Sequence, residues 1–264
     1  MLFRRSVLDD GRIALLPFDA IWGFASPVVA LDTDLARSVH AIATALRNES
    51  DWTATLVTGI KPASDLEGAL IANLSQIGRL ALADERVRAV ASLQGGIAGY
   101  MSRRPRTFER NLRQATRRAG NSVTFECADR SEPASIISRL HGVEQHSWKG
   151  LESSGIESPE MSALYGSLVW RLSVLGALRV TFAVRGGRDV GFVLGGVLGT
   201  TYRGLQLSFV EEVRALSIGN LLQWNELVRL CDDGVERYDL GMDMEYKRVW
   251  AEERFVTRPI VVFR

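Results

Sequence analysis

The sequence predicts an α/β fold of the α+β type, in which helices flank a mixed, mostly antiparallel sheet. Apolar alternation typical of strands recurs between stretches of helical spacing along the 264 residues. Three predicted strands follow one another closely at residues 178–184, 190–198 and 202–210. A cluster of arginines separates the two halves of the chain, so we predict lobes at residues 1–120 and 121–264.

The composition is that of an ordinary globular protein, with 46% apolar residues, 24% charged residues and a net charge of +1. Such a neutral balance gives no global field that would attract nucleic acid or a membrane. No apolar run approaches the roughly 20 residues of a membrane helix, and the acids near the start argue against a signal peptide. The three histidines and two cysteines lack metal-ligand spacing. We therefore expect a cytoplasmic protein without a membrane span or a metal site.

The first lobe is predicted to mix strands and helices. The strands are expected at residues 12–16, 21–24, 52–58 and 79–83. Helical spacing predicts helices at residues 33–47 and 63–74. Asp32 or Thr33 is the expected N-cap of the first helix.

An arginine-rich helix is predicted to close this lobe. Residues 103–118 hold seven arginines and one glutamate, and Thr107 is the expected N-cap. Phe108, Leu112 and Ala115 fall on one face, with the arginines mostly on the other. The charged face either lies in solvent between the lobes or binds RNA, a phosphorylated acceptor or anionic lipid.

The second lobe has the predicted order β-α-α-β-β-β-α-β-α-β. Beyond the three strands, its predicted elements are a strand at 123–127, helices at 133–146, 159–175 and 217–232, a strand at 235–240, a helical turn at 246–250 and a strand at 255–263. Gly186-Gly187 is the expected hairpin turn between the first two strands of the close series.

The turn after the strand at 202–210 is predicted to bind an anion. A strand that leads through Ser217 and Gly219 into a helix leaves several backbone N–H groups unpaired. Those groups and the helix dipole suit a pyrophosphate, and Arg214 adds a charged contact. The alternative is an ordinary helix start with Ser217 as its N-cap.

Five short motifs occur in order along the chain. They are Arg106-x-x-x-x-Asn-Leu-Arg-x-Ala-x-Arg-Arg118, Ser147-Trp-Lys-Gly150, Ser217-Ile-Gly-Asn-Leu-Leu222, Asp239-Leu-Gly241 and Tyr246-Lys-x-x-Trp250. With the element order, they resemble the GNAT superfamily of acyltransferases. Within it they resemble acetyltransferases associated with cellulose biosynthesis, the CelD/BcsL type, which is related to Fem-type aminoacyltransferases. The resemblance covers about residues 95–255 and implies a GNAT acyltransferase fold, with a diverged GNAT-like N-terminal lobe as in Fem-type proteins.

The resemblance implies that acetyl-CoA or another acyl-CoA is the donor. Its pantetheine arm would pair with the splayed strand at 205–210, at Leu207 and Phe209. Its pyrophosphate would lie on a turn formed by Arg214, Leu216, Ser217, Ile218, Gly219, Asn220 and Leu221. The GNAT signature is Gln/Arg-x-x-Gly-x-Gly/Ala, and this chain departs from it by having Ser217 at the first glycine position.

The resemblance also implies roles for residues near the end of the predicted sheet. Tyr246 is the candidate general acid for the departing thiolate, and Lys247 would neutralise developing charge. Asp239 would orient substrate. The alternatives are a half-buried aromatic residue, a surface lysine and a strand-end capping carboxylate.

The acceptor site is implied to lie in the loop between the first two helices of the second lobe. His146, Trp148 and Lys149 are its candidate residues, for a small-molecule or saccharide acceptor. Glu144 and Glu212 are further candidate bases. The alternative is a helix C-cap at Gly150 with a core tryptophan.

The expected reaction is direct attack of an amine or hydroxyl on the thioester. Two other functions remain open at this point: a Fem-like aminoacyltransferase that uses aminoacyl-tRNA, and a non-catalytic protein that binds acyl-CoA or a polysaccharide precursor. We expect nucleic acid not to be a partner, because the chain has no wider basic field than the arginine-rich helix.

Overall fold

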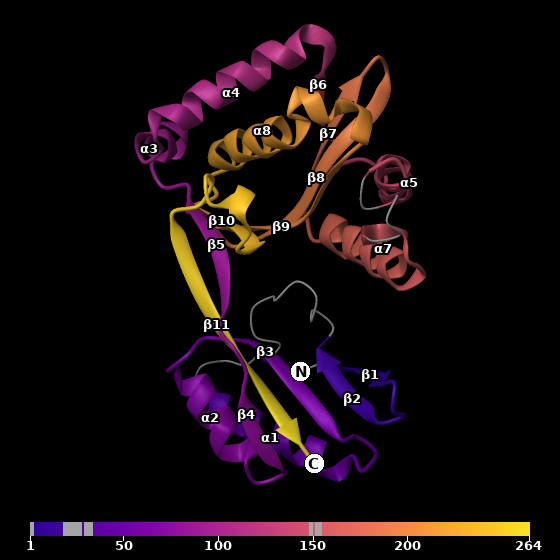
Figure 1. Ribbon diagram of the computed structural model, residues 1–264, viewed down its shortest axis with the longest axis vertical. Helices are drawn as coiled ribbons and strands as arrows, with labels where there is room; N and C mark the ends of the chain where they lie inside the picture. The colour runs from indigo at the N-terminus through magenta and orange to yellow at the C-terminus, as the bar shows by residue number, and fades with distance from the viewer. Residues whose placement is uncertain (1–2, 18–27, 29–33, 148–149, 151–154) are drawn as a thin grey trace. The chain divides into compact units, whose positions relative to one another are not determined.

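The computed structural model describes residues 3–17, 28, 34–147, 150 and 155–264, and its contacts divide the chain into two compact units (Figure 1). The first unit comprises Met1–Ala89, Gly241–Met244 and Glu253–Arg264, and the second comprises Val90–Leu240 and Glu245–Glu252. This division differs from the boundary predicted near residue 120, and it assigns the arginine-rich helix to the second unit. The predicted strand at 21–24 and the predicted caps Asp32 and Thr33 lie outside the described residues.

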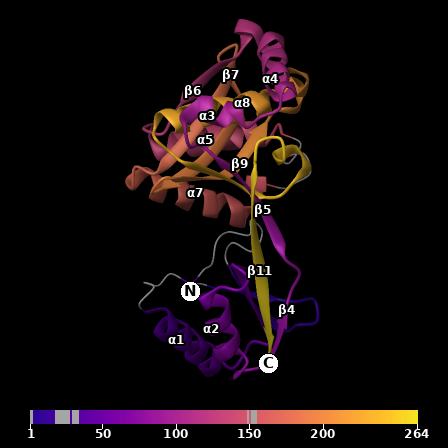
Figure 2. The same ribbon diagram turned by 90° about the vertical axis from the view of Figure 1, so that its left-hand side faces the viewer.

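The first unit is a sheet with two helices. Its strands are β1 (Phe3–Val7), β2 (Ile13–Pro17), β3 (Ala54–Ile60), β4 (Arg79–Leu82) and β11 (Glu253–Phe263). β2 and β3 are parallel, while β1 with β2, β3 with β11, and β4 with β11 are antiparallel. The helices α1 (Leu35–Asn48) and α2 (Asp65–Leu74) lie side by side next to these strands (Figure 2). The last strand of the chain therefore completes the N-terminal sheet.

The second unit is a mixed sheet covered by helices on both faces. Its strands are β6 (Thr124–Cys127), β7 (Leu178–Arg185), β8 (Arg188–Leu198), β9 (Thr201–Phe209) and β10 (Arg237–Met242), the last of which ends in the first unit. Strands β6 to β9 pair antiparallel in chain order, and β10 is parallel to β9. Figure 1 shows α8 (Ile218–Asp232) and α4 (Arg106–Ala119) on one face, with α5 (Pro133–Glu144) and α7 (Pro159–Val174) on the other.

The predicted order of elements in the second lobe is confirmed, with local differences. The helical turn predicted at 246–250 is a short 3₁₀ turn, η5 (Glu245–Lys247). Thr107 lies inside α4 rather than at its N-cap, because the helix begins at Arg106 after the extended Pro105. Among the strands and α-helices that the structure describes, β1, β5 (Arg86–Ser92) and α3 (Gly96–Ser102) were not predicted from the sequence.

A β-bulge bends β9 where the site is predicted. Leu194 of β8 pairs with Gln206 and Gly195 pairs with Gly204, so Leu205 is the additional residue. A bulge bends its strand and increases the local twist. The register between β9 and β10 covers only residues 201–203 and 237–239. β9 thus bends just after its short parallel pairing with β10, as in the splayed strand implied by the resemblance.

A glycine of β8 permits close packing beside this bulge. A Cβ atom on Gly195 would lie 2.3 Å from Tyr202 Cζ and 2.4 Å from the carbonyl oxygen of Arg203. Any larger residue at this position would displace β9.

Of the helices that the structure describes, none has the length and apolar character needed to span a bilayer.

Candidate active site

The chain leaves β9 through a 3₁₀ turn, η4 (Glu211–Leu216), and enters α8 at Ile218. Between them, Ser217 adopts a left-handed conformation with φ 58° and ψ 37°. Ser217 occupies the N-cap position of α8, as the alternative interpretation predicted, but its side chain makes no capping hydrogen bond and its backbone is not in the extended region typical of an N-cap. A serine in this conformation costs about 1–2 kcal/mol relative to its preferred region. Ser217, which stands at the first glycine position of the GNAT signature, thus keeps the left-handed backbone that glycine favours.

The first backbone N–H groups of α8 follow directly after this residue. The carbonyl of Ser217 accepts from the N–H groups of Asn220 (3.0 Å) and Leu221 (3.2 Å). The N–H groups of Ile218 and Gly219 come before these two bonds, so no carbonyl within α8 accepts from them. N–H groups at the positive end of a 15-residue helix form a site suited to an anion.

The side chains around this turn face inward. A Cβ atom on Gly219 would lie 3.0 Å from Phe209 Cε1 and 3.5 Å from Leu207 Cδ2. Gly219 therefore allows the first turn of α8 to pack closely on β9. Ile218 and Leu221 are buried. Gly219, Ile218 and Leu221 can therefore contact a ligand through their backbone atoms. The side chains of Ile218 and Leu221 are buried and cannot reach a ligand.

Arg214, in η4, supplies a cation shortly before the start of α8. Its guanidinium is exposed and lies 2.6 Å from the Glu211 carboxylate. Exposed ion pairs of this kind are weak, so a phosphate can replace Glu211 as the partner. Leu216, the last residue of η4, is half-buried.

The predicted acceptor loop begins next to the predicted donor turn. Ser147 forms an antiparallel bridge with Val210, and the N–H of Glu211 donates to the carbonyl of His146 (3.1 Å). The His146 side chain is exposed, with Nδ1 3.0 Å from the carbonyl of Gly142. Trp148 and Lys149 lie outside the described residues. The structure thus brings one of the three acceptor candidates to the donor turn.

Gly150 is required by a close backbone approach. A Cβ atom on it would lie 2.1 Å from the carbonyl oxygen of Glu144, and its N–H donates to Ser147 Oγ (3.2 Å). Gly150 therefore lies against the C-terminal end of α5, but the C-cap residue of this helix is Gln145, so the alternative that made Gly150 the C-cap is wrong.

The three catalytic candidates gather around the end of β10. Lys247 is half-buried and donates from Nζ to the carbonyl of Leu240 (2.7 Å), the residue after Asp239. Tyr246 is 58% exposed, and its ring centre lies 5.6 Å from Lys247 Nζ. Arg203 Nη1 donates to Asp239 Oδ1 (2.6 Å) across the β9–β10 pair. The Asp239 carboxylate thus ties the two strands together where their short pairing ends.

A buried polar cluster on the opposite face of β9 joins Glu144, a predicted candidate base, to Tyr165 and Gln206, which the sequence analysis did not single out. Glu144 is fully buried and accepts from Gln206 Nε2 (2.9 Å), whereas its Oε2 atom has no partner among the described residues. The Tyr165 hydroxyl donates to the carbonyl of Leu205, the bulge residue (3.3 Å). Gln206, a polar residue inside an apolar strand, was the available sequence signal. A buried carboxylate oxygen without a donor is costly and marks this cluster as a candidate part of the site.

Comparison with known proteins identifies the family and the fold. Residues 102–248, more than half of the chain, match the family described as the acetyltransferase (GNAT) domain. The chain has no match among the curated proteins.

Several solved structures resemble the whole chain. A C-terminal domain assigned to a lysylphosphatidylglycerol synthetase of Agrobacterium fabrum is 16% identical, with a TM-score of 0.61, over 98% of this chain and 83% of that one. L-PGS from Bacillus licheniformis is 11% identical, with a TM-score of 0.59, over 98% and 83%. FemX is 12% identical, with a TM-score of 0.59, over 97% and 87%. At these identities the likeness concerns the fold alone.

Proposed function

Because this chain belongs to the family of acetyltransferase (GNAT) domains, it is an acyltransferase, and we propose that its donor is an acyl-CoA. The observation that carries this proposal is the turn before α8, where the left-handed Ser217 leads into the first N–H groups of the helix, at Ile218 and Gly219, and the exposed Arg214 lies a few residues before them. Two aligned donors, a helix dipole and a guanidinium are the groups that a diphosphate needs. In this proposal the pantetheine arm runs along the bent part of β9, at residues 205–209.

The proposed reaction is direct attack of an amine or hydroxyl on the thioester carbonyl, without a covalent enzyme intermediate. Holding the two substrates together supplies most of the rate enhancement. Tyr246 gives a proton to the departing thiolate, and Lys247 stabilises the charge that develops there. Asp239 acts as a positioning residue by holding Arg203 and the end of β10.

We propose that the acceptor binds beside His146, at the loop that meets the donor turn. Trp148 and Lys149 follow His146 in the chain and are the proposed contacts to a polar acceptor. A saccharide acceptor agrees with the resemblance to acetyltransferases associated with cellulose biosynthesis. An aromatic ring and an ammonium group offer a sugar a stacking face and a hydrogen-bond donor.

A melting-temperature screen against CoA, acetyl-CoA and longer acyl-CoAs tests the donor. Ligand at one hundred times its Kd stabilises the folded state by about 2.7 kcal/mol, which corresponds to a rise of roughly 5–10 °C for a chain of this size. If no member of the series shifts the melting temperature at millimolar concentration, acyl-CoA is not the donor.

The variant Arg214→Gln tests whether the diphosphate of the donor binds at the proposed turn. Affinity for CoA should fall about tenfold, because a hydrogen bond to a charged group contributes about 1.5–3 kcal/mol. Arg188→Gln is the matched control, since Arg188 forms a similar exposed pair with Glu212. Gly219→Val is a poorer test, because the added side chain would meet Phe209. Equal CoA affinity in both arginine variants would place the diphosphate elsewhere.

A Fem-like aminoacyltransferase is the second candidate. It is favoured by the likeness of fold to FemX over 97% of this chain and by the arginines on the exposed face of α4. Tight tRNA binding that weakens steeply with salt would support it over acyl-CoA.

A further inference from the structure

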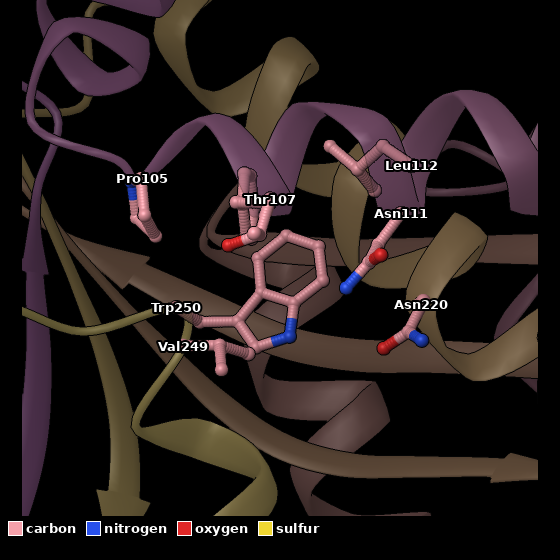
Figure 3. A pocket seen from close by; sticks show the side chains of 8 residues that line it. Pro105, Thr107, Asn111, Leu112, Asn220, Val249 and Trp250 are labelled. Carbon is pink, nitrogen blue, oxygen red and sulfur yellow. The ribbon is translucent and has the colours of Figure 1, made fainter.

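A small cavity of about 110 Å³ lies in the second unit, between α4, the first turn of α8 and the segment that ends at Trp250 (Figure 3). Its lining combines apolar groups with two amides and a hydroxyl: Phe108, Leu112 and Trp250, then Asn111, Asn220 and Thr107. Pockets for a whole drug-sized ligand begin at roughly 300 Å³. This cavity therefore has room for a single ring system.

The polar groups at the cavity are unused. Trp250 is only 3% exposed, yet its indole N–H has no hydrogen-bond partner among the described residues and points toward Asn111 and Asn220 (Figure 3). The side-chain amides of Asn111 and Asn220 likewise make no hydrogen bond within the described part of the chain. An indole N–H that faces a cavity and has no partner in the protein is available to donate to a bound ligand.

The indole is held in place by contacts that leave its N–H free. The ring packs edge-on against Phe108, with 5.0 Å between ring centres, and the carbonyl of Trp250 accepts from the Tyr100 hydroxyl (2.9 Å). The N–H group is thus fixed toward the cavity by the surrounding core.

We propose that this cavity binds the adenine ring of the donor, an inference that rests on the proposed function. Each amide presents both a donor and an acceptor, and an asparagine side chain can bond the edge of adenine at two atoms. The apolar walls suit the faces of a flat heterocycle. A sugar would leave its hydroxyls against Phe108 and Leu112 and would fit less well.

The position of the cavity agrees with the proposed diphosphate site. Asn220 directly follows Gly219 in the first turn of α8, and the helix rises only about 1.5 Å per residue. A nucleotide with its base beside Asn220 can therefore place its phosphates at the start of α8. Acyl-CoA and the 3′ end of an aminoacyl-tRNA both carry adenosine, so the cavity suits either donor.

The test measures binding of CoA, adenosine 3′,5′-bisphosphate and 4′-phosphopantetheine by calorimetry. Asn111→Leu and Asn220→Leu should each weaken CoA and the adenosine bisphosphate about tenfold and leave phosphopantetheine unchanged. Gln114 is an exposed residue of α4 that does not line the cavity, so Gln114→Leu is the matched control. It should bind all three ligands like the parent. Trp250→Phe keeps the ring, removes the N–H and should weaken the two adenosine ligands several-fold.

The outcomes separate this inference from the proposed function. Parent-like affinity of both asparagine variants for CoA would overturn the adenine site while the acyl-CoA donor stands. If the parent binds a short oligonucleotide ending in adenosine but not CoA, and both asparagine variants lose that binding, the adenine site stands and the donor is wrong. Failure of the parent to bind any adenosine ligand at millimolar concentration would overturn the inference. Stronger binding of long acyl-CoAs by Asn111→Leu than by the parent would also overturn the inference, because it would mean that an apolar chain occupies the cavity.

Discussion

The two compact units differ in how deeply they bury carboxylates: Glu67 of the first unit keeps 6% of its surface exposed, and the second unit holds two carboxylates with none exposed. The core cluster of the first unit is apolar, with Ile60, Leu70 and Leu74 fully buried beside Trp52, whose indole N–H donates to a backbone carbonyl. The second unit instead buries two carboxylates completely, those of Glu144 and Glu226. Removing a charge from water costs several kcal/mol, and only good partners offset that cost.

The buried polar groups of the second unit flank β9 and α8. Glu144 contacts β9 through Gln206, and Glu226 belongs to α8. These are the two elements that also form the proposed donor turn. The difference suggests a division of labour, in which the first unit adds apolar stability and the second spends some of its stability on a polar site.

The largest loss of stability is expected when Arg229 is replaced, because its guanidinium pairs with the buried Glu226 carboxylate and the half-buried Asp129 carboxylate of the second unit. Arg229 Nη1 donates to both carboxylate oxygens of Asp129 (2.9 Å each), and Nη2 donates to Glu226 (2.8 Å). Arg229→Met leaves a fully buried carboxylate without its cation, so the free energy of unfolding should fall by about 3–5 kcal/mol. Urea unfolding measures this. Adding Glu226→Gln should restore part of it, and a loss below about 1 kcal/mol would contradict the comparison.

The pH dependence of that variant sharpens the same point. Burial raises the pKa of Glu226, and removal of Arg229 should raise it further. A carboxyl whose pKa is higher in the folded than in the unfolded state binds a proton on folding. Its destabilising effect is therefore absent below the unfolded pKa, about 4.3, and grows as the pH rises through the folded pKa. The stability deficit of Arg229→Met should thus shrink toward pH 4, and a deficit that stays constant would count against a buried charge.

Leu70→Ala tests whether the first unit acts only through stability. Leu70 is fully buried, so the cavity should cost about 2–5 kcal/mol of unfolding free energy. Affinity for CoA, measured where the variant is still folded, should equal that of the parent. A drop in affinity beyond the folded fraction would break the comparison by linking the first unit to the site.

Tyr246→Phe tests chemistry in the second unit. If Tyr246 protonates the thiolate, turnover should fall about 100-fold, equivalent to roughly 2.7 kcal/mol of barrier, with donor affinity unchanged. The release of free thiol from acetyl-CoA in the presence of amine or hydroxyl acceptors measures the rate. Turnover equal to that of the parent would reduce Tyr246 to a packing residue.

The smallest effect on stability is expected on α4. Arg106, Arg110, Arg113 and Arg117 are exposed and follow the i, i+4, i+7, i+11 spacing of one helix face. Changing Arg110, Arg113 and Arg117 to Ala should alter stability by at most about 0.5 kcal/mol. We expect RNA binding of the parent to stay in the non-specific range of about 10⁻⁴–10⁻⁶ M at physiological salt. Submicromolar tRNA binding that the triple variant loses, with a log–log salt slope near −3.6 for four phosphate contacts, would instead favour the Fem-like donor.

The arginine face of α4 illustrates what local pattern predicts well. Phe108, Leu112, Ala115 and Ala119 are buried, and the arginines of this helix are exposed, as the spacing predicts. Gly186 and Gly187 have positive φ angles in the predicted hairpin turn. Helix periodicity and turn chemistry depend on neighbours a few residues apart, so sequence alone determines them.

The missed elements depend on distant partners. β1 pairs only with β2 among the described strands, and its Arg5 is exposed, so its sequence alternates weakly. The first unit is completed by β11, which pairs with β3 about two hundred residues earlier. The composition of the chain near residue 120 gives no sign that its last strand returns to the first unit, so the predicted boundary left β11 in the second lobe.

By itself, the sequence determined the order of elements in the second lobe, the helix faces and the position of the turn before α8. Tertiary structure alone decided what that turn offers a ligand. The left-handed backbone of Ser217 and the burial of Glu144 arise from packing between residues far apart in the chain, as does the contact that Gly219 makes with Phe209. The same is true of the cavity where Asn111, Asn220 and Trp250 meet. Local propensity acts over a few residues, whereas the free energy that fixes these positions comes from long-range burial, which a single sequence does not display.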